Sequence, residues 1–153
     1  MDSILVTVGT RPFAQRIGRL LSSRYEVVYA SSEPFPDVLL KQRYYRIPTG
    51  ANPTFVHEIL KLCLDNGCQM ILPLSKIELQ ALHEARVLLE EYDITVLLPR
   101  DLENCFILEN PAGTIRILRS GKDMLTDEQL ADIGFSGVGM LSDSGEDPVL
   151  CLA

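Results

Sequence analysis

The residues best suited to bind a ligand follow the first apolar stretch of the chain. Ile4–Val8 is a run of strand-forming residues, and Gly9, Thr10 and Arg11 come directly after it, just before a proline. Proline fits the first position of a helix, so these three residues lie between the end of a strand and the free N–H groups of a helix. Open α/β sheets bind anionic ligands at this place, and a guanidinium can hold a carboxylate or phosphate with two hydrogen bonds. The sequence therefore predicts an anion-binding loop at residues 9–11.

Glu33 is the acidic candidate for the same site. It follows the apolar run Glu26–Ala30 and should therefore lie just past the end of the second strand. In dinucleotide-binding folds, an acid roughly 20 residues after the glycine loop holds the ribose hydroxyls. Only Gly9 of the G-x-G-x-x-G fingerprint is present, because Arg11 and Ala14 occupy the other two glycine positions. NAD binding is therefore a minor alternative.

Ser75, Lys76 and Glu78 follow the apolar run 70–73 and complete the candidate site. Ser75 and Glu78 have the S-x-x-E spacing of a capping box, in which the serine oxygen accepts a helix N–H and the glutamate returns to the backbone of the cap. Glu78 thus has a structural explanation and a ligand-binding explanation, and the sequence favours neither. If the first and fourth strands are neighbours, these residues lie beside the 9–11 loop.

The order of the apolar runs predicts an α/β, Rossmann-like fold with an open, mostly parallel five-stranded sheet. Continuous apolar runs are typical of parallel strands that helices cover on both faces. We expect the first and fourth strands to be central and adjacent, and the third, which carries a charge, to lie at an edge. The predicted strands are 4–8, 26–30, 44–47, 70–73 and 95–98, and the predicted helices are 12–23, 53–66, 76–92 and 101–109, with a helical turn at 37–43.

Hydrophobic spacing also predicts which helix faces are buried. The helix 76–92 should turn Ile77, Ala81, Ala85, Leu88 and Tyr92 inward. The arginines of the first helix, at positions 16, 19 and 24, are expected to form its solvated face rather than a funnel for anions.

We expect two parts, a Rossmann-like domain at residues 1–110 and a C-terminal α+β extension at residues 111–153. The extension is predicted to contain a strand at Thr114–Leu118, a helix from Thr126 to Gly134, and strands at Gly137–Leu141 and Pro148–Leu152. The helix is indicated by Thr126 and Gln129 at capping-box spacing and by Gly134 as a terminator. The acidic stretch 142–147 is expected to be a hairpin turn rather than a calcium loop.

Composition narrows the class of partner. The chain has 153 residues and a formal net charge of −7, which argues against nucleic acid as the main partner. No signal peptide or membrane-spanning run is apparent, so we expect a cytoplasmic protein with no membrane partner. The four cysteines and two histidines have no metal-ligand spacing, and no metal site is expected.

These residues resemble the N-terminal pre-ATP-grasp domain of ATP-grasp ligases, particularly those similar to the carbamoyl-phosphate synthase large subunit and to pyrrolysine-biosynthesis ligase. In that family a proline ends the fourth strand and a glutamate lies in the first turn of the next helix, which Pro73 and Glu78 match. Lys76 stands where the family frequently has an acid, and Ile107–Glu109 stands where Asn-Asp-Lys usually leads into the ATP-grasp domain. The stretches that carry the resemblance are 4–10, 25–30, 44–48, 70–79 and 94–99.

The resemblance implies a stand-alone domain that binds a small molecule or acts as a partner or regulatory module. The remaining residues, 111–153, are too few for the catalytic parts of an ATP-grasp enzyme, so ATP and Mg²⁺ would enter only through a separately encoded ATP-grasp subunit, and the chain would have no cofactor and no reaction of its own. One alternative is the substrate-binding subunit of a split ATP-grasp carboxylate-amine ligase. Another is a nucleotide-sugar or NAD enzyme domain, because Val6–Thr10 is similar to the start of certain N-acetylglucosaminyltransferases. Expected partners are a second copy or an ATP-grasp subunit, and a small anionic ligand.

Overall fold

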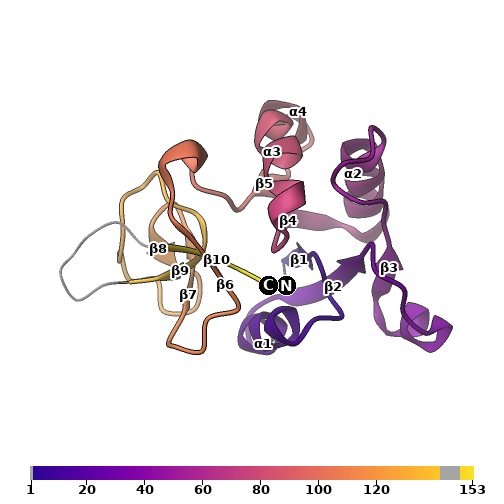
Figure 1. Cartoon of the computed structure of the whole chain (residues 1–153), viewed down its shortest axis with the longest axis horizontal. Coiled ribbons are helices and arrows are strands. Elements are labelled where there is room, and N and C mark those ends of the chain that lie inside the picture. Colours follow the sequence, from indigo (N-terminus) through magenta and orange to yellow (C-terminus); the bar gives the residue numbers. More distant parts are fainter. Residues whose placement is uncertain (1, 142–148) are drawn as a thin grey trace.

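The computed structural model describes residues 2–141 and 149–153, and it contains two five-stranded sheets (Figure 1). Every neighbouring pair in the first sheet is parallel, which confirms the predicted α/β class. The strands β1 and β4 are adjacent and central, and β3 lies at an edge, as the sequence predicts. In order across the sheet, the strands are β3 (Tyr44–Arg46), β2 (Glu26–Ser31), β1 (Ser3–Val6), β4 (Cys68–Leu72) and β5 (Thr95–Val96).

The connections of the first sheet leave it in opposite directions on either side of β1. The helix α1 (Pro12–Leu21) joins β1 to β2, and the chain then crosses over through α2 (Phe55–Asn66) to reach β4. The helices α3 (Lys76–Glu84) and α4 (Arg86–Glu91) join β4 to β5. The chain therefore turns to opposite faces of the sheet between β1 and β4, and such a switch point is the usual ligand site of this architecture.

The two faces of the first sheet bury different side chains. Ile4 and Val6 of β1 pack with the α1 side chains Phe13 and Ile17. Leu5 points to the other face, where α2, α3 and α4 cover it. This alternation explains why Ile4, Leu5 and Val6 are all apolar, since neither face of β1 meets water.

The second sheet is built mainly from the C-terminal part of the chain. Its pairs are antiparallel, except that β6 and β10 run parallel. The predicted strands of the extension are present with slightly shifted ends, and the acidic stretch 142–147 lies outside the described residues. In order, the strands are β6 (Ile107–Glu109), β10 (Val149–Leu152), β9 (Gly137–Met140), β7 (Arg116–Arg119) and β8 (Lys122–Asp123).

The second sheet packs onto the first in two ways. Side chains of both sheets share the same buried clusters, and arginines in and just after α1 contact the C-terminal part of the chain. Ile117 and Val138 belong to the same buried cluster as Ile4 and Val6. Arg16 donates to the carbonyls of residues 111 and 113, at 2.8 and 2.5 Å, and Arg24 donates to the carbonyls of residues 124 and 125. The prediction that these two arginines only face water is therefore wrong, because their guanidinium groups tie α1 to the C-terminal part.

The long helix predicted at 76–92 is two helices with a different buried face. The chain leaves helical geometry at Ala85, where φ is −87° and ψ is 4°, so the spacing of apolar residues does not continue across it. Leu79, Leu82 and Leu89 are buried, whereas Ile77 is 54% exposed. Leu88 and Tyr92 are exposed as well, so the predicted inner face is wrong at these three positions, whereas Ala81 and Ala85 pack against the core as predicted.

Two predicted helices are absent. Residues 101–109 form one 3₁₀ turn, η2 (Leu102–Asn104), and then β6, because β10 offers a strand to pair with. Asp101 accepts hydrogen bonds from the Asn104 side chain rather than capping a helix. Between 126 and 134 there is no helix, because buried Asp123 accepts the N–H groups of Leu125 and Thr126 and so stabilises a turn.

A further 3₁₀ helix, η1 (Asp37–Gln42), occupies the helical turn predicted at 37–43. Gly67 ends α2 in the left-handed conformation, with φ at 66°, as the sequence indicates.

No helix in the described part of the chain is both long and apolar enough to cross a membrane.

Candidate functional site

The loop that follows β1 is held in a strained conformation. Val8 has a φ of 45°, which is rare for a β-branched residue and occurs mainly where the surrounding structure enforces it. The Gly9 N–H donates to the Ala30 carbonyl at 2.9 Å, and Gln15 donates to the Gly9 carbonyl. A Cβ atom at Gly9 would lie 2.6 Å from the Tyr29 Cβ, so the close approach to β2 requires glycine. The loop is therefore a fixed platform at the end of β1.

Thr7 connects this loop to the segment after β4. Its side chain is fully buried, and its Oγ1 accepts the Leu74 N–H at 2.8 Å. Its own N–H donates to the Leu72 carbonyl at 3.2 Å. Since the hydroxyl oxygen already accepts a bond, its hydrogen is free to point at the carboxyl of Glu78, to which Thr7 forms a side-chain hydrogen bond.

Glu78 is a buried carboxyl whose hydrogen bonds are incomplete. Only 3% of the residue is exposed, and its Oε1 atom has no hydrogen-bond partner among the described residues. Burial raises the pKa of Glu78 to about 7, although the Thr7 hydroxyl, the Ser75 backbone and the Arg11 charge each act to lower it. A carboxyl that is half protonated near neutral pH can donate or accept a hydrogen bond, and such groups are concentrated at functional sites.

Arg11 and Glu33 form an ion pair at the mouth of the site. The Arg11 Nε donates to the Glu33 Oε1 at 2.7 Å, and both side chains are nearly half exposed. This hydrogen bond is the main cause that raises the pKa of Arg11, with further contributions from the charges of Glu33, Glu109 and Glu78. Within the described residues the Arg11 Nη atoms make no hydrogen bond, so they remain able to bind an anion.

The remaining predicted site residues lie around this group, with one correction. Ser75 is the N-cap residue of α3 but makes no side-chain cap bond, so only the glutamate half of the predicted capping box forms, the hydrogen bond between the Glu78 carboxyl and the Ser75 backbone. The Glu78 N–H also donates to the Ser75 carbonyl at 3.0 Å. The Glu78 carboxyl is hydrogen-bonded to the Ser75 backbone, so the cap explains part of its position but leaves the Oε1 atom without a partner among the described residues. Lys76 is exposed on the first turn of α3, and Thr10 is half-buried beside Arg11.

The segment that carries Gly50 closes over the first turn of α3. A Cβ atom at Gly50 would lie 2.5 Å from the Ile77 carbonyl oxygen and 2.8 Å from the Glu78 Cα. The backbone at residue 50 therefore rests directly on the turn that holds the buried carboxyl. We call Thr7–Arg11, Glu33 and Ser75–Glu78 the switch-point site, with the Gly50 segment as its cover.

Sequence reasoning missed Thr7, Val8 and Gly50. Thr7 and Val8 were placed inside the first strand, because β-branched residues favour strands, but β1 ends at Val6. A polar threonine at the end of an otherwise apolar run was the available signal for Thr7. Nothing in the sequence around Gly50 indicates that its backbone packs against a helix that begins far along the chain.

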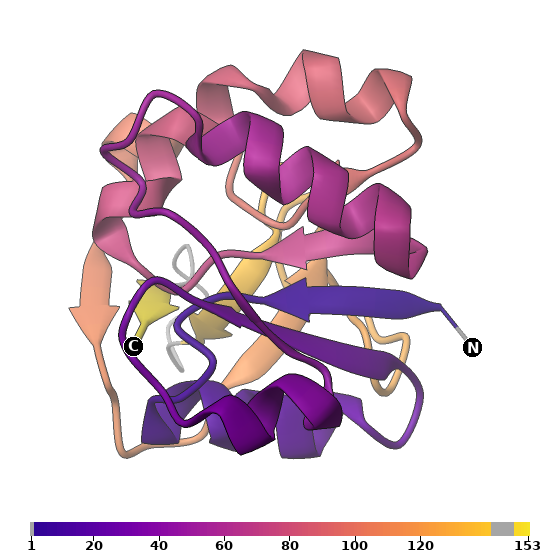
Figure 2. The ribbon, with the colours of Figure 1, turned by 90° about the vertical axis from the view of Figure 1, so that its right-hand side faces the viewer.

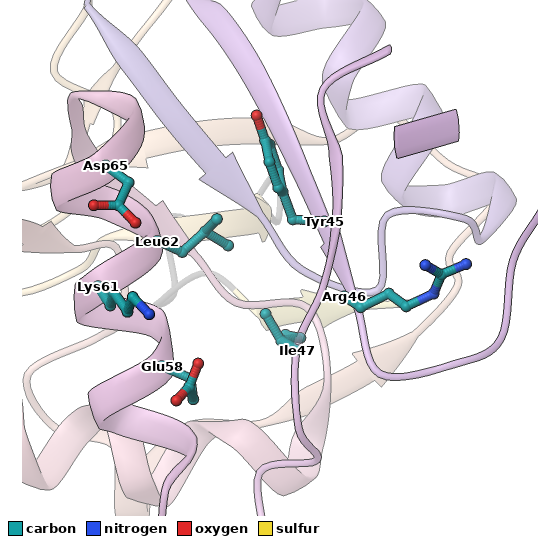
Figure 3. Close-up of a pocket in the computed structure, with 7 residues that line it drawn as sticks. All are labelled: Tyr45, Arg46, Ile47, Glu58, Lys61, Leu62 and Asp65. Atoms are coloured by element: carbon teal, nitrogen blue, oxygen red, sulfur yellow. The ribbon is translucent and has the colours of Figure 1, made fainter. Parts of the chain in front are cut away.

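A separate open hollow of about 150 Å³ lies between the edge strand β3 and α2 (Figure 3). Tyr45, Ile47 and Leu62 provide its apolar surface, and the α2 charges Glu58 and Lys61 line it. The Tyr45 hydroxyl is already bound to the Asn66 side chain at 2.8 Å. The hollow contains none of the residues of the switch-point site.

The described residues include no group of three or more His, Cys, Asp or Glu side chains that could hold a metal ion. His57 is exposed, as expected, whereas His83 is only partly exposed and its Nδ1 atom is buried. The buried thiols of Cys63 and Cys68 are hydrogen-bonded to each other, which raises the pKa of Cys63 and lowers that of Cys68.

No model of a known protein family matches the chain, and no curated protein is significantly similar to it in sequence.

Proposed function

We propose that this chain is a small-molecule-binding module of the pre-ATP-grasp kind and that its ligand binds at the switch-point site. The observation that carries the proposal is Glu78, a carboxyl with 3% exposure, a pKa of about 7 and an unpartnered oxygen. Leaving a buried acceptor without a partner costs about 1–3 kcal/mol, so a structural role alone does not explain its presence.

The chemistry of the site favours a ligand that carries both a hydrogen-bond donor and an anionic group. An ammonium, amide or hydroxyl group would satisfy the Oε1 atom of Glu78. A carboxylate or phosphate would bind the free Nη atoms of Arg11, while Glu33 continues to hold its Nε. The fixed backbone of the Gly9 loop supports Arg11 at the required edge of the sheet.

Ligand entry requires a movement of the cover. The Oε1 atom of Glu78 is closed to solvent, and the backbone at Gly50 rests on the same turn of α3. We propose that the Gly50 segment lifts when the ligand enters and that the ligand then completes the hydrogen bonds of Glu78.

The test is an NMR screen that follows the side-chain carboxyl carbon of Glu78 in the full-length chain. The probes are three pools at millimolar concentration: amino acids, dicarboxylic acids and nucleotides including ATP. A ligand of the site should shift the Glu78 signal, and its binding should be lost in Glu78→Gln and weakened by about 1.5–3 kcal/mol in Arg11→Ala. Glu91→Gln, at an exposed position of α4, is the control and should bind normally. If no pool shifts Glu78, or if Glu78→Gln binds as well as the unchanged chain, the proposal is wrong.

A further inference from the structure

The outer edge of β6 is an unpaired strand edge with exposed apolar side chains. β6 is the last strand of the second sheet, and only β10 pairs with it among the described residues. It is the orange arrow at the left of Figure 2, with the yellow β10 on its inner side. Phe106 is 81% exposed, Ile107 36% and Leu108 42%, so three apolar residues in a row meet solvent. Exposed edges of this kind tend to pair with another strand.

The hydrogen-bond register shows which backbone groups are free. The Leu150 N–H donates to the Phe106 carbonyl at 2.8 Å, and the Asn110 N–H donates to the Leu152 carbonyl at 2.7 Å. Backbone groups alternate in direction along a strand, so Leu108 also faces β10. Ile107 and Glu109 therefore direct their N–H and C=O groups away from the sheet, where an incoming strand would find two donors and two acceptors.

The charged side chains of the segment that contains β6 are all acidic. Residues 101–109 contain Asp101, Glu103 and Glu109 and no Lys or Arg. Glu103 and Glu109 are exposed and form no ion pair with any described residue. A second copy of this chain, whose net charge is −7, would bring the same acids against them. An extended segment with lysines or arginines between apolar residues complements both the charge and the exposed apolar side chains.

We propose that the outer edge of β6 binds an extended basic and apolar segment of a partner protein, which adds to the second sheet as a sixth strand. The segment would exchange backbone hydrogen bonds with Ile107 and Glu109. Its apolar residues would cover the exposed side chains of 106–108, and its cations would pair with Glu103 and Glu109. The charge of Glu109 acts on Arg11, so a bound segment lies close to the switch-point site.

The test uses a blocked heptapeptide of alternating lysine and valine as the probe, with the full-length chain. Titration should shift the backbone amide signals of Ile107 and Glu109, and both amides should become protected from hydrogen exchange. Ile107→Lys places a cation on the edge and should weaken binding about tenfold or more, and Glu109→Lys should do the same. Ile133→Lys is the matched control, since Ile133 is 75% exposed and lies outside β6, and it should bind as the unchanged chain does.

A heptapeptide of alternating glutamate and valine provides the charge control and should not bind. The proposal is overturned if the lysine peptide does not bind, if the glutamate peptide binds equally, or if Ile107→Lys and Ile133→Lys bind alike. Analytical ultracentrifugation measures whether the chain associates with a second copy of itself. A dimer that Ile107→Lys breaks and Ile133→Lys leaves intact would identify a second copy as the occupant and overturn the assignment to a basic segment.

Discussion

The first sheet is entirely parallel and has both faces covered by other parts of the chain, whereas the second is mostly antiparallel and ends on β6, whose outer edge no described residue pairs with. The first sheet therefore places its polar chemistry at the carboxyl ends of its strands, where Glu78 is buried. The second sheet instead has outward-facing backbone N–H and C=O groups along the outer edge of β6. The comparison indicates that the molecule has two surfaces suited to different partners, a small ligand for the first sheet and an extended segment for the second.

The sheets are expected to unfold together despite their different construction. Leu5→Ala in β1 and Leu150→Ala in β10 each remove a fully buried side chain from one shared cluster. Each should lower the free energy of unfolding by about 2–5 kcal/mol, because a cavity remains. Urea denaturation should show a single transition for both variants. Leu64→Ala, at a position 52% exposed on α2, is the control. Two separate transitions would show that the sheets are independent units.

The buried carboxyl should make stability fall as pH rises. The pKa of Glu78 is about 7 in the folded chain and 4.5 for an ordinary glutamate, so folding favours the protonated form. Stability from this group is complete below pH 4.5 and decreases up to pH 7, by about 3 kcal/mol.

Glu78→Gln removes that dependence, so the variant should gain stability relative to the unchanged chain as pH rises, and the gain should level off above pH 7. Urea denaturation at a series of pH values measures it. Glu91→Gln should retain the original dependence. A constant difference in stability between Glu78→Gln and the unchanged chain across this pH range would argue against the buried carboxyl.

The junction between the two sheets should depend on Arg16 more than on its neighbour on the same helix. Arg16→Ala removes hydrogen bonds to two backbone carbonyls of the C-terminal part and should cost about 1–2 kcal/mol. Arg19→Ala removes an exposed arginine whose side chain donates no hydrogen bond to any described residue, and the unfolding free energy should hardly change. Equal effects in thermal unfolding would mean that the Arg16 contacts do not stabilise the junction.

The smallest effect is expected at the mouth of the site. Arg11 and Glu33 form an ion pair whose side chains are 46% and 43% exposed, and exposed pairs contribute only about 0–1 kcal/mol. Glu33→Ala should therefore change the free energy of unfolding by less than about 1 kcal/mol, and high salt should reduce the change. A larger loss would show that the pair has a structural role beyond the site.

The first sheet could be predicted because its physical signals are local. Ile4–Leu5–Val6 is apolar at every position, and Phe13 and Ile17 show helical spacing. The second sheet could be predicted only in part: β7, β9 and β10 were expected, but Ile107–Glu109 becomes a strand only when β10 pairs with it. Thr126 and Gln129 have helix-capping spacing, but Gln129 donates to the carbonyls of residues 120 and 131 and holds a turn against β8. Contacts with distant parts of the chain determine the secondary structure of these segments, and the local spacing of residues carries no information about such contacts.

Some residues of the candidate site could likewise be predicted from the sequence, and others could not. Gly9, Arg11 and Glu33 were identifiable from their positions after predicted strands, and the structure brings Arg11 and Glu33 into contact. The burial of Glu78 was not identifiable, because the S-x-x-E spacing already explains a glutamate at this position, and only the geometry shows that its Oε1 atom is buried without a partner among the described residues. The cover at Gly50 comes from a distant part of the chain, so no local pattern could indicate it.

The measurement that tests the account most directly is the pKa of the Glu78 carboxyl in the full-length chain. An NMR pH titration of its side-chain carbon, assigned by comparison with Glu78→Gln, gives this value. The account predicts about 7, because the carboxyl is buried and its Oε1 atom lacks a partner. A pKa at or below the ordinary value of 4.5 would mean that the carboxyl is solvated or fully hydrogen-bonded, and it would contradict the assignment of the switch-point site.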